Sequence, residues 1–389
     1  MSKINSRSFS NENQDGAPDL VGITTFSATS YFVPTRGNTV QRPSDHVEVG
    51  SIRYNYDIKN LEYYKGDLLG WSQFELIDPD LGGGTGSNKG TGVRGLTMSS
   101  NDGAAGSESN VIEFITISTL GDMQDFGDLS IETRQGTGFS SRTRAIQAGG
   151  YDGSNRKNNI EFVTIPSLGN AIDFGDLQET RIGNPSGISN QIRGLVAAGE
   201  NPGNTNDIDY ITIASTGNAV DFGHLSNAYQ TGFAAGSTTR GIFAGGRGTP
   251  GYYNVIEFVT FTTTGDVTDF GDLSDQKKGS GKGNASNSTR AIFCGEDKSG
   301  DTITNVIDFI TIASTGNATD FGDATSAITT VANLFSSTRG VFSAGYNGSS
   351  NVNSIQFVEI ATTGNAQDFG DCSQTNASRT GATSGHGGL

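Results

Sequence analysis

A short phrase that recurs along the chain at nearly constant spacing limits how this sequence can fold more than any other feature. One copy, NVIEFVTFTTTGDVTDFGDLS, begins at Asn254. Six copies share one phenylalanine position, namely Phe126, Phe174, Phe222, Phe270, Phe321 and Phe369. Successive phenylalanines are 48 residues apart, except for one step of 51. A period of this size predicts an architecture of repeated units, each packing on its neighbours.

The letters DFG within this phrase also mark the magnesium-binding loop of protein kinases. A kinase has one such loop, together with a Gly-rich loop, a strand lysine and an H-R-D-type loop. This chain has six DFG copies and none of the other signatures, so the phrase is architectural. We predict that the phenylalanine packs between units, the glycine lies at a bend, and Asp269 and Asp272 accept backbone N–H bonds. A calcium or magnesium site at such paired carboxylates is the alternative, although His224 replaces the second one in the third copy.

Each repeat has the pattern of four short β-strands. In the fourth repeat, apolar runs lie at residues 232–236, 241–245 and 255–261, and a fourth run ends at Phe270. The third strand of the first repeat, NVIEFITI, is largely apolar on both faces, so neighbouring sheets must cover both sides. Four strands in such a unit are typical of a propeller blade, and the 56 glycines suit tight turns. We therefore predict an all-β fold with a six-bladed β-propeller over residues 88–389.

A second phrase, such as TRGIFAGG, precedes each copy and carries an arginine before the second strand. These arginines are Arg94, Arg144, Arg193, Arg240, Arg290 and Arg339. The third strand carries an acid in five repeats (Glu113, Glu161, Asp209, Glu257 and Asp308) and Gln356 in the sixth. We predict a repeated ion pair or hydrogen bond between arginine and acid, without essential chemistry.

The order of these features resembles kelch-type repeats, in which a glycine-terminated second strand precedes a third strand and an aromatic residue on the fourth. Only two copies carry the kelch double glycine, at Gly149-Gly150 and Gly245-Gly246. Phe126 and its counterparts stand where kelch repeats have tryptophan. The resemblance implies a kelch-like propeller.

The end of the chain predicts how the ring closes. The final residues, RTGATSGHGGL, match the first-strand phrase QTGFAAGSTTRG of the fourth repeat and then stop. The first repeat lacks a comparable strand before Arg94. We therefore expect the C-terminal strand to complete the sheet of the first repeat.

Charge and composition disfavour several functions. The net charge of −16 disfavours binding to nucleic acid or to an anionic membrane. The chain has two cysteines, no signal-peptide pattern and no apolar run long enough to span a bilayer, so we expect synthesis in a cytoplasm and no membrane insertion. His46, His224 and His386 are too scattered to suggest a metal site or a catalytic pair. We predict no catalytic residues, metal or cofactor; a carboxylate pair in a central channel, as in propeller glycosidases, is the enzymatic alternative.

The loops on one face of the ring vary between repeats, whereas the turns on the other face are nearly uniform. The loops between second and third strands include YDGSNRKN, RGTPGYY and YNGSSNV. Variable loops on a uniform scaffold are where ligands bind, and exposed aromatics suit sugars or proteins. The candidate ligand-binding residues are Tyr151, Asp152, Arg247, Tyr252, Tyr253, Tyr346 and Asn347. The alternative is that these are merely tolerated loop residues.

Residues 1–87 do not belong to the repeats. Ile52, Tyr54 and Tyr56 alternate before a turn at 57–60 and a return at 61–64, which predicts a β-hairpin. The region is rich in aromatic residues, and we expect several to form an assembly interface: Tyr31, Phe32, Tyr54, Tyr63 and Trp71.

The same region carries an RG-T-QRP phrase, built from Arg36, Gly37, Thr39, Gln41, Arg42 and Pro43. The phrases G-x-I-R-Y-N and L-E-Y-Y-x-G follow it. This stretch resembles a segment of bacteriophage virion proteins, especially tail-fibre and appendage proteins of cyanobacterial phages. The resemblance implies a virion structural protein that binds other virion proteins, or copies of itself, through residues 1–87. The propeller would then present loops to a host-surface glycan or protein. A propeller glycan hydrolase and a cytoplasmic kelch-like adaptor are the alternatives.

Overall fold

The computed structural model describes residues 34–43, 47–58, 60–73, 93–101, 108–279, 285–300 and 302–385. The chain divides into two compact units, Met1–Ile77 and Asp78–Leu389. The predicted boundary between residues 87 and 88 lies outside the described residues. Within the described ranges, no helix is long and apolar enough to cross a membrane.

The first unit contains a four-stranded sheet in the order β1-β2-β3-β4. Its elements are β1 (Thr35–Gly37), the 3-10 helix η1 (Thr39–Gln41), β2 (Ile52–Asn55), β3 (Asn60–Tyr64) and β4 (Trp71–Gln73). The predicted hairpin is confirmed, because β2 and β3 pair antiparallel with Tyr54 opposite Leu61. The parallel pairing of β1 with β2 was not predicted from the sequence.

A charged network occupies the interior of this first unit. The Glu62 carboxylate is fully buried and accepts hydrogen bonds from Arg42, Arg53 and Asn55. Arg42 belongs to the phrase that resembles virion proteins, so this part of the phrase has a structural role. Among the described residues of this unit, Tyr64 is the only large apolar side chain that is buried.

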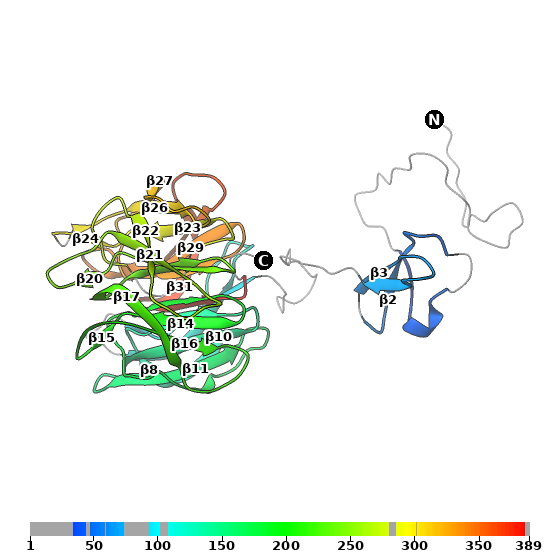
Figure 1. The fold of residues 1–389 in the computed structure, drawn as a ribbon, viewed down its shortest axis with the longest axis horizontal. Helices are drawn as coiled ribbons and strands as arrows, with labels where there is room; N and C mark the ends of the chain where they lie inside the picture. Colours follow the sequence, from blue (N-terminus) through cyan, green and yellow to red (C-terminus); the bar gives the residue numbers. More distant parts are fainter. Residues whose placement is uncertain are drawn as a thin grey trace, which may run out of the picture. The chain divides into compact units, whose positions relative to one another are not determined.

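The second unit is all-β, with one main sheet of three or more strands for each sequence repeat, and Figure 1 shows its strands. The first sheet contains β32 (Thr380–Thr383), β5 (Arg94–Met98), β7 (Glu108–Thr116) and β8 (Gln124–Thr133), and β6 (Ser100–Asn101) also pairs with β7. The second contains β9 (Thr137–Ser140), β10 (Arg144–Tyr151), β11 (Arg156–Thr164) and β12 (Ile172–Asp176). The third contains β13 (Ser186–Ser189), β14 (Arg193–Ala197), β16 (Gly203–Thr212) and β17 (Val220–Gln230), with β15 (Glu200–Asn201) paired to β16 and β20 (Arg247–Gly248) paired to β17.

The remaining repeats follow the same order. The fourth sheet contains β18 (Phe233–Gly236), β19 (Arg240–Ala244), β21 (Val255–Thr260) and β22 (Thr268–Asp272). The fifth contains β23 (Arg290–Cys294), β26 (Val306–Thr311) and β27 (Thr319–Asp323), beside the small pair β24 (Asp297–Lys298) and β25 (Thr302–Ile303). The sixth contains β28 (Ala332–Phe335), β29 (Arg339–Tyr346), β30 (Asn351–Glu359) and β31 (Gln367–Asn376). The four strands predicted in the fourth repeat are therefore confirmed.

The six sheets contact one another in a closed cycle. The Gly169 N–H of the second sheet donates to the Phe126 carbonyl of the first, at 3.0 Å. Equivalent bonds join each later pair of sheets, and the Gly121 N–H of the first sheet donates to the Phe369 carbonyl of the sixth, at 3.0 Å. The last repeat therefore contacts the first.

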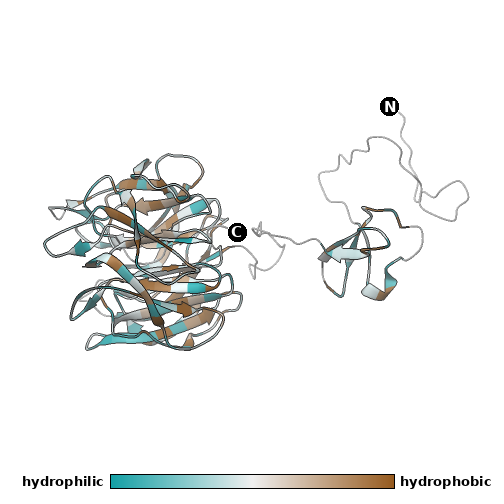
Figure 2. Ribbon diagram, in the orientation of Figure 1, coloured by the Kyte–Doolittle hydropathy of each residue, from teal (hydrophilic) through white to brown (hydrophobic). Residues whose placement is uncertain are grey.

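In the described part of this unit, the hydrophobic core lies between consecutive sheets as six separate clusters, one at each step of the cycle. On β7, Ile112 packs toward the second sheet and Ile115 toward the sixth, so this strand is covered on both faces as predicted. The six phenylalanines of the DFG phrase are each 1–3 % exposed. Figure 2 shows hydrophobic residues concentrated on the strands and hydrophilic residues in many of the loops.

The C-terminal strand completes the first sheet, as the sequence predicted. β32 pairs antiparallel with β5, with Thr380 opposite Met98 and Thr383 opposite Gly95. The first and last described strands of the second unit thus share one sheet.

Candidate functional site

The seven predicted ligand-binding residues lie on loops of three different repeats, so the structure does not bring them together in one site. Tyr151 ends β10, and the Arg134 guanidinium lies 5.3 Å from the centre of its ring. The Asp152 carboxylate accepts the Asn155 N–H and pairs with the Lys157 ammonium at 2.5 Å. These partners hold the pKa of Asp152 far below its usual range. Asp152 therefore shapes its own loop, whereas Tyr151 contacts Arg134, the residue after β8 of the first sheet, through its ring and a backbone bridge.

The loop of the sixth repeat is built in the same way. The Tyr346 hydroxyl donates to the Gly348 carbonyl at 2.9 Å, although the side chain is exposed. The Asn347 side-chain oxygen accepts the N–H groups of Ser349 and Ser350, both at 2.9 Å. An Asp or Asn at this position closes the turn through its own side chain.

The loop of the fourth repeat contacts the third sheet through a strand pairing. Arg247, on β20, pairs with Gln230 at the end of β17 and forms a bridge with Tyr252. Tyr253 packs against Tyr229 of the third repeat, with 6.4 Å between ring centres. Arg247 and Tyr253 are therefore held beside side chains of another repeat.

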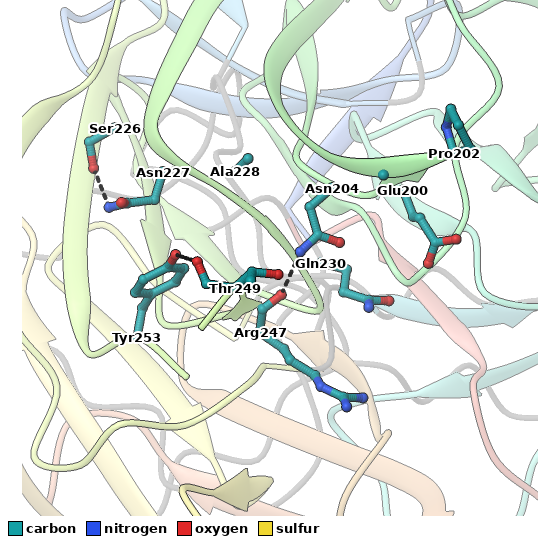
Figure 3. A pocket seen from close by; sticks show the side chains of 12 residues that line it. Glu200, Pro202, Asn204, Ser226, Asn227, Ala228, Gln230, Arg247, Thr249 and Tyr253 are labelled. Carbon is teal, nitrogen blue, oxygen red and sulfur yellow. Dashed lines mark hydrogen bonds between the residues drawn. The ribbon is translucent and has the colours of Figure 1, made fainter. Parts of the chain in front are cut away.

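An open groove of about 770 Å³ lies between the third and fourth repeats, and Arg247 and Tyr253 both line it (Figure 3). The other lining residues are Glu200, Pro202, Gly203, Asn204, Ser226, Asn227, Ala228, Gln230, Gly248 and Thr249. Most of these belong to the third repeat and were not predicted. The available signal was the polar text ENPGNT and SNAYQ, which lies at the start of β16 and at the end of β17.

The groove contains two oppositely charged side chains, and one of them is neutralised. The Glu200 carboxylate pairs with the Arg156 guanidinium at 2.6 Å. Arg247 is exposed, and its guanidinium forms no ion pair within the described chain. In Figure 3, the contact drawn to Arg247 runs from Asn204 to its backbone carbonyl, at 3.3 Å.

The predicted assembly residues of the first unit fall into two groups. Tyr31 and Phe32 lie outside the described residues. Tyr54 lies edge-on to Tyr56 with ring centres 5.9 Å apart, the Lys65 ammonium lies 5.2 Å from the Tyr63 ring, and Trp71 packs on Tyr64 at 5.4 Å. Tyr54, Tyr63 and Trp71 are all partly exposed.

Aliphatic residues that the sequence reasoning did not select are the most exposed apolar groups of this unit. Leu68 is 99 % exposed, Val40 88 %, Val49 72 % and Leu69 71 %. With a charged interior and an apolar exterior, the described part of this unit reverses the usual distribution of a globular domain.

The predicted pairing of the repeat arginine with the third-strand acid is wrong. The Arg144 guanidinium lies 4.4 Å from the centre of the Phe162 ring and donates to the Ile213 carbonyl of the next sheet at 2.8 Å. Glu161 instead accepts the Ser130 hydroxyl and N–H of the preceding sheet. The stacked pairs are Arg94–Phe114, Arg144–Phe162, Arg193–Tyr210, Arg240–Phe258, Arg290–Phe309 and Arg339–Phe357. In the second repeat, the arginine therefore contacts the following sheet and the acid contacts the preceding one.

The buried acids of the first, third and fifth repeats have buried cationic partners. The pairs are Glu113 with Arg379, Asp209 with Arg181 at 3.0 Å, and Asp308 with Lys277 at 2.6 Å. No such cation pairs with the acid of the second or fourth repeat among the described residues, and Glu161 and Glu257 accept hydrogen bonds from Ser130 and Ser226. Burial raises the pKa of both glutamates.

The aspartates of DFGD do not act as predicted. In the fourth repeat, the Asp269 and Asp272 carboxylates accept no hydrogen bond from the described residues. The Asp272 backbone makes the contacts, because its N–H donates to the Asn317 side chain and its carbonyl accepts from Ala318. No group of three His, Cys, Asp or Glu side chains in the described ranges could hold a metal ion.

The hydrolase alternative requires carboxylates where the first strands of the sheets meet. These strands contact one another through hydroxyls: Ser189 donates to the Ser140 carbonyl at 2.6 Å, and Ser140 donates to the Thr383 carbonyl at 2.8 Å. The described first-strand residues include no aspartate or glutamate. The described residues of these first strands therefore contribute no carboxylate to such an acid pair.

The chain matches no protein family, and no curated protein is significantly similar to it in sequence. Relationships to kelch-type repeats and to phage virion proteins therefore depend on the residues quoted above.

Proposed function

We propose that this protein is a structural component of a bacteriophage virion, as a fibre, tail or capsid-surface appendage. Its N-terminal unit attaches it to other virion proteins or to further copies of itself. Its repeat unit is a six-bladed kelch-like propeller that presents variable loops to a host-surface glycan or protein.

The closed cycle of sheet contacts supports the propeller. Six repeats pack through six clusters of the same kind, and the sixth contacts the first. The sharing of one sheet by β32 and β5 matches the way in which a ring of blades is closed.

The distribution of apolar groups in the first unit supports attachment, and it is the observation that carries the proposal. Leu68, Leu69, Val40 and Val49 are exposed while Glu62 and Arg53 are buried. Exposing apolar surface of this kind is unfavourable unless a partner covers it.

The proposal is tested by asking whether the protein is part of purified particles. Phage banded on a density gradient would be examined by mass spectrometry, and an antibody against the repeat unit would locate the protein by electron microscopy. We expect the protein in the particle band, with label at a constant position. Protein found only in the host lysate would instead favour the adaptor, and sugar release from host envelope would favour the hydrolase.

A further inference from the structure

We infer that the groove between the third and fourth repeats binds an acidic saccharide, and that the Arg247 guanidinium receives the anionic group of the sugar. This inference deepens the proposed function and rests on it, because such a sugar would belong to the host surface.

The charges of the groove favour an anionic ligand. Glu200 is paired with Arg156, whereas the exposed guanidinium of Arg247 has no ion-pair partner among the described residues. The groove therefore retains one positive charge in a protein whose net charge is −16. A guanidinium binds a carboxylate or sulfate through two parallel hydrogen bonds, which gives strength and orientation together.

The remaining lining is suited to sugar hydroxyls. Asn204, Asn227 and Gln230 contribute amide groups that can both donate and accept hydrogen bonds, as hydroxyls require. The volume of about 770 Å³ falls within the range of small-molecule sites. An open groove of this volume suits a short segment of a polysaccharide chain.

The backbone that carries Arg247 is fixed before any ligand binds. Arg247 pairs with Gln230 on β17, and the Tyr253 N–H donates to the Gly246 carbonyl at 2.9 Å. The Tyr253 ring covers Gly248 so closely that a Cβ at that glycine would lie 2.4 Å from the ring. Because the loop is already ordered, less conformational entropy is lost on binding.

Calorimetry on the full chain would test this with three oligosaccharides of equal length: an oligogalacturonate, a sulfated galacto-oligosaccharide and a neutral galacto-oligosaccharide. We expect binding of at least one acidic probe, weakened by added salt, and no comparable binding of the neutral one. Arg247→Ala should weaken binding roughly tenfold. The affinity of Arg247→Lys should lie between those of the wild type and Arg247→Ala, because lysine keeps the charge but loses the bidentate geometry. Arg142→Ala removes another exposed arginine, from a turn outside the groove, and should leave binding unchanged.

The outcomes separate this inference from the proposed function. Equal affinity for neutral and acidic probes, an Arg247→Ala protein that binds normally, or no binding of any probe would overturn the groove assignment. If the protein is nevertheless found in particles, the proposed function stands. Conversely, Arg247-dependent binding by a protein that is missing from particles would support the groove and remove the virion assignment.

Discussion

At the scale of single residues, the members of the DFGD phrase contribute in different ways to the packing of neighbouring sheets. The burial of Phe270 follows from its hydrophobicity and its recurrence at the end of an apolar strand. The partners of Asp272 depend on which groups of the next sheet lie opposite, and these are 45 residues away in the chain. Gly271 is required because the next sheet lies too close for a side chain. A Cβ at this position would lie 2.5 Å from the Gly316 carbonyl oxygen, and the φ of Gly271 is +149°.

Replacing Phe270 with alanine should lower the free energy of unfolding by about 3–5 kcal/mol, because the ring is buried and packs edge-on to Phe258 at 6.1 Å. Asp272→Asn is the control, since its carboxylate has no hydrogen bond to lose within the described chain. Chemical denaturation of both variants would measure the difference. Similar small losses in the two proteins would show that Phe270 is not a core residue.

The acids of the third strands predict how stability depends on pH. Burial raises the pKa of Glu257 above its ordinary value of 4.5, so the folded state holds this proton more tightly than the unfolded state. The contribution of Glu257 to the free energy of unfolding therefore falls as the pH rises from about 4.5 through the raised pKa of the folded state. Above that pKa this contribution does not fall further. The sixth repeat carries Gln356 at this position, and its side-chain oxygen accepts the Thr325 hydroxyl and N–H.

Glu257→Gln should accordingly raise the free energy of unfolding at pH 8, on the order of 1 kcal/mol for relieving one buried, hydrogen-bonded charge. The difference from wild type should vanish near pH 4, where the glutamate is protonated in both states. Thermal melts across this range would measure it, with Asp320→Asn as a control at an exposed carboxylate. A variant that is less stable than wild type at pH 8 would contradict this account.

At the scale of elements, strands were predictable wherever the repeat itself supplied the pattern. The four strands of the fourth repeat and the β2–β3 hairpin follow from short-range alternation and turn residues. The pairing of β20 with β17 crosses from one repeat to the next, and β1 pairs in parallel with β2 across η1. Neither strand pairing follows from a short-range pattern in the sequence, so neither was predicted. The third-repeat side of the groove was not predicted for the same reason.

Deleting residues 381–389 tests the closing strand. It removes nearly all of β32, leaves β5 as an unpaired edge, and breaks the contact between Thr383 and Ser140. We expect a sharply lower melting temperature, since β5 loses its partner strand and Ala382 is removed from the cluster between the first and second sheets. Deleting residues 386–389 alone should leave the melting temperature unchanged. If the longer deletion melts like the full chain, β32 does not hold the ring together.

At the scale of the whole molecule, the two units use their apolar residues in opposite ways. The repeats place theirs in clusters between sheets, where periodicity made them predictable. The first unit buries Arg53, Asn55 and Glu62 and exposes its aliphatic groups. The abundance of aromatic residues there is visible in the composition. Which of them are buried depends on the polar network around Glu62, and a hydrophobicity pattern does not reveal that network.

This contrast predicts a division of labour between the two parts of the chain. Expressed alone, residues 88–389 should remain monomeric but no longer join particles, because their apolar surface is largely satisfied by neighbouring sheets. Residues 1–87 should retain assembly, since exposed groups such as Leu68 and Val40 need a covering partner. Light scattering and an incorporation assay on both fragments would measure this, with Leu68→Ser in the full chain as a finer probe that leaves the buried Glu62 network intact. If the isolated repeat unit enters particles as well as the whole protein does, attachment lies in the repeats and the first unit has another role.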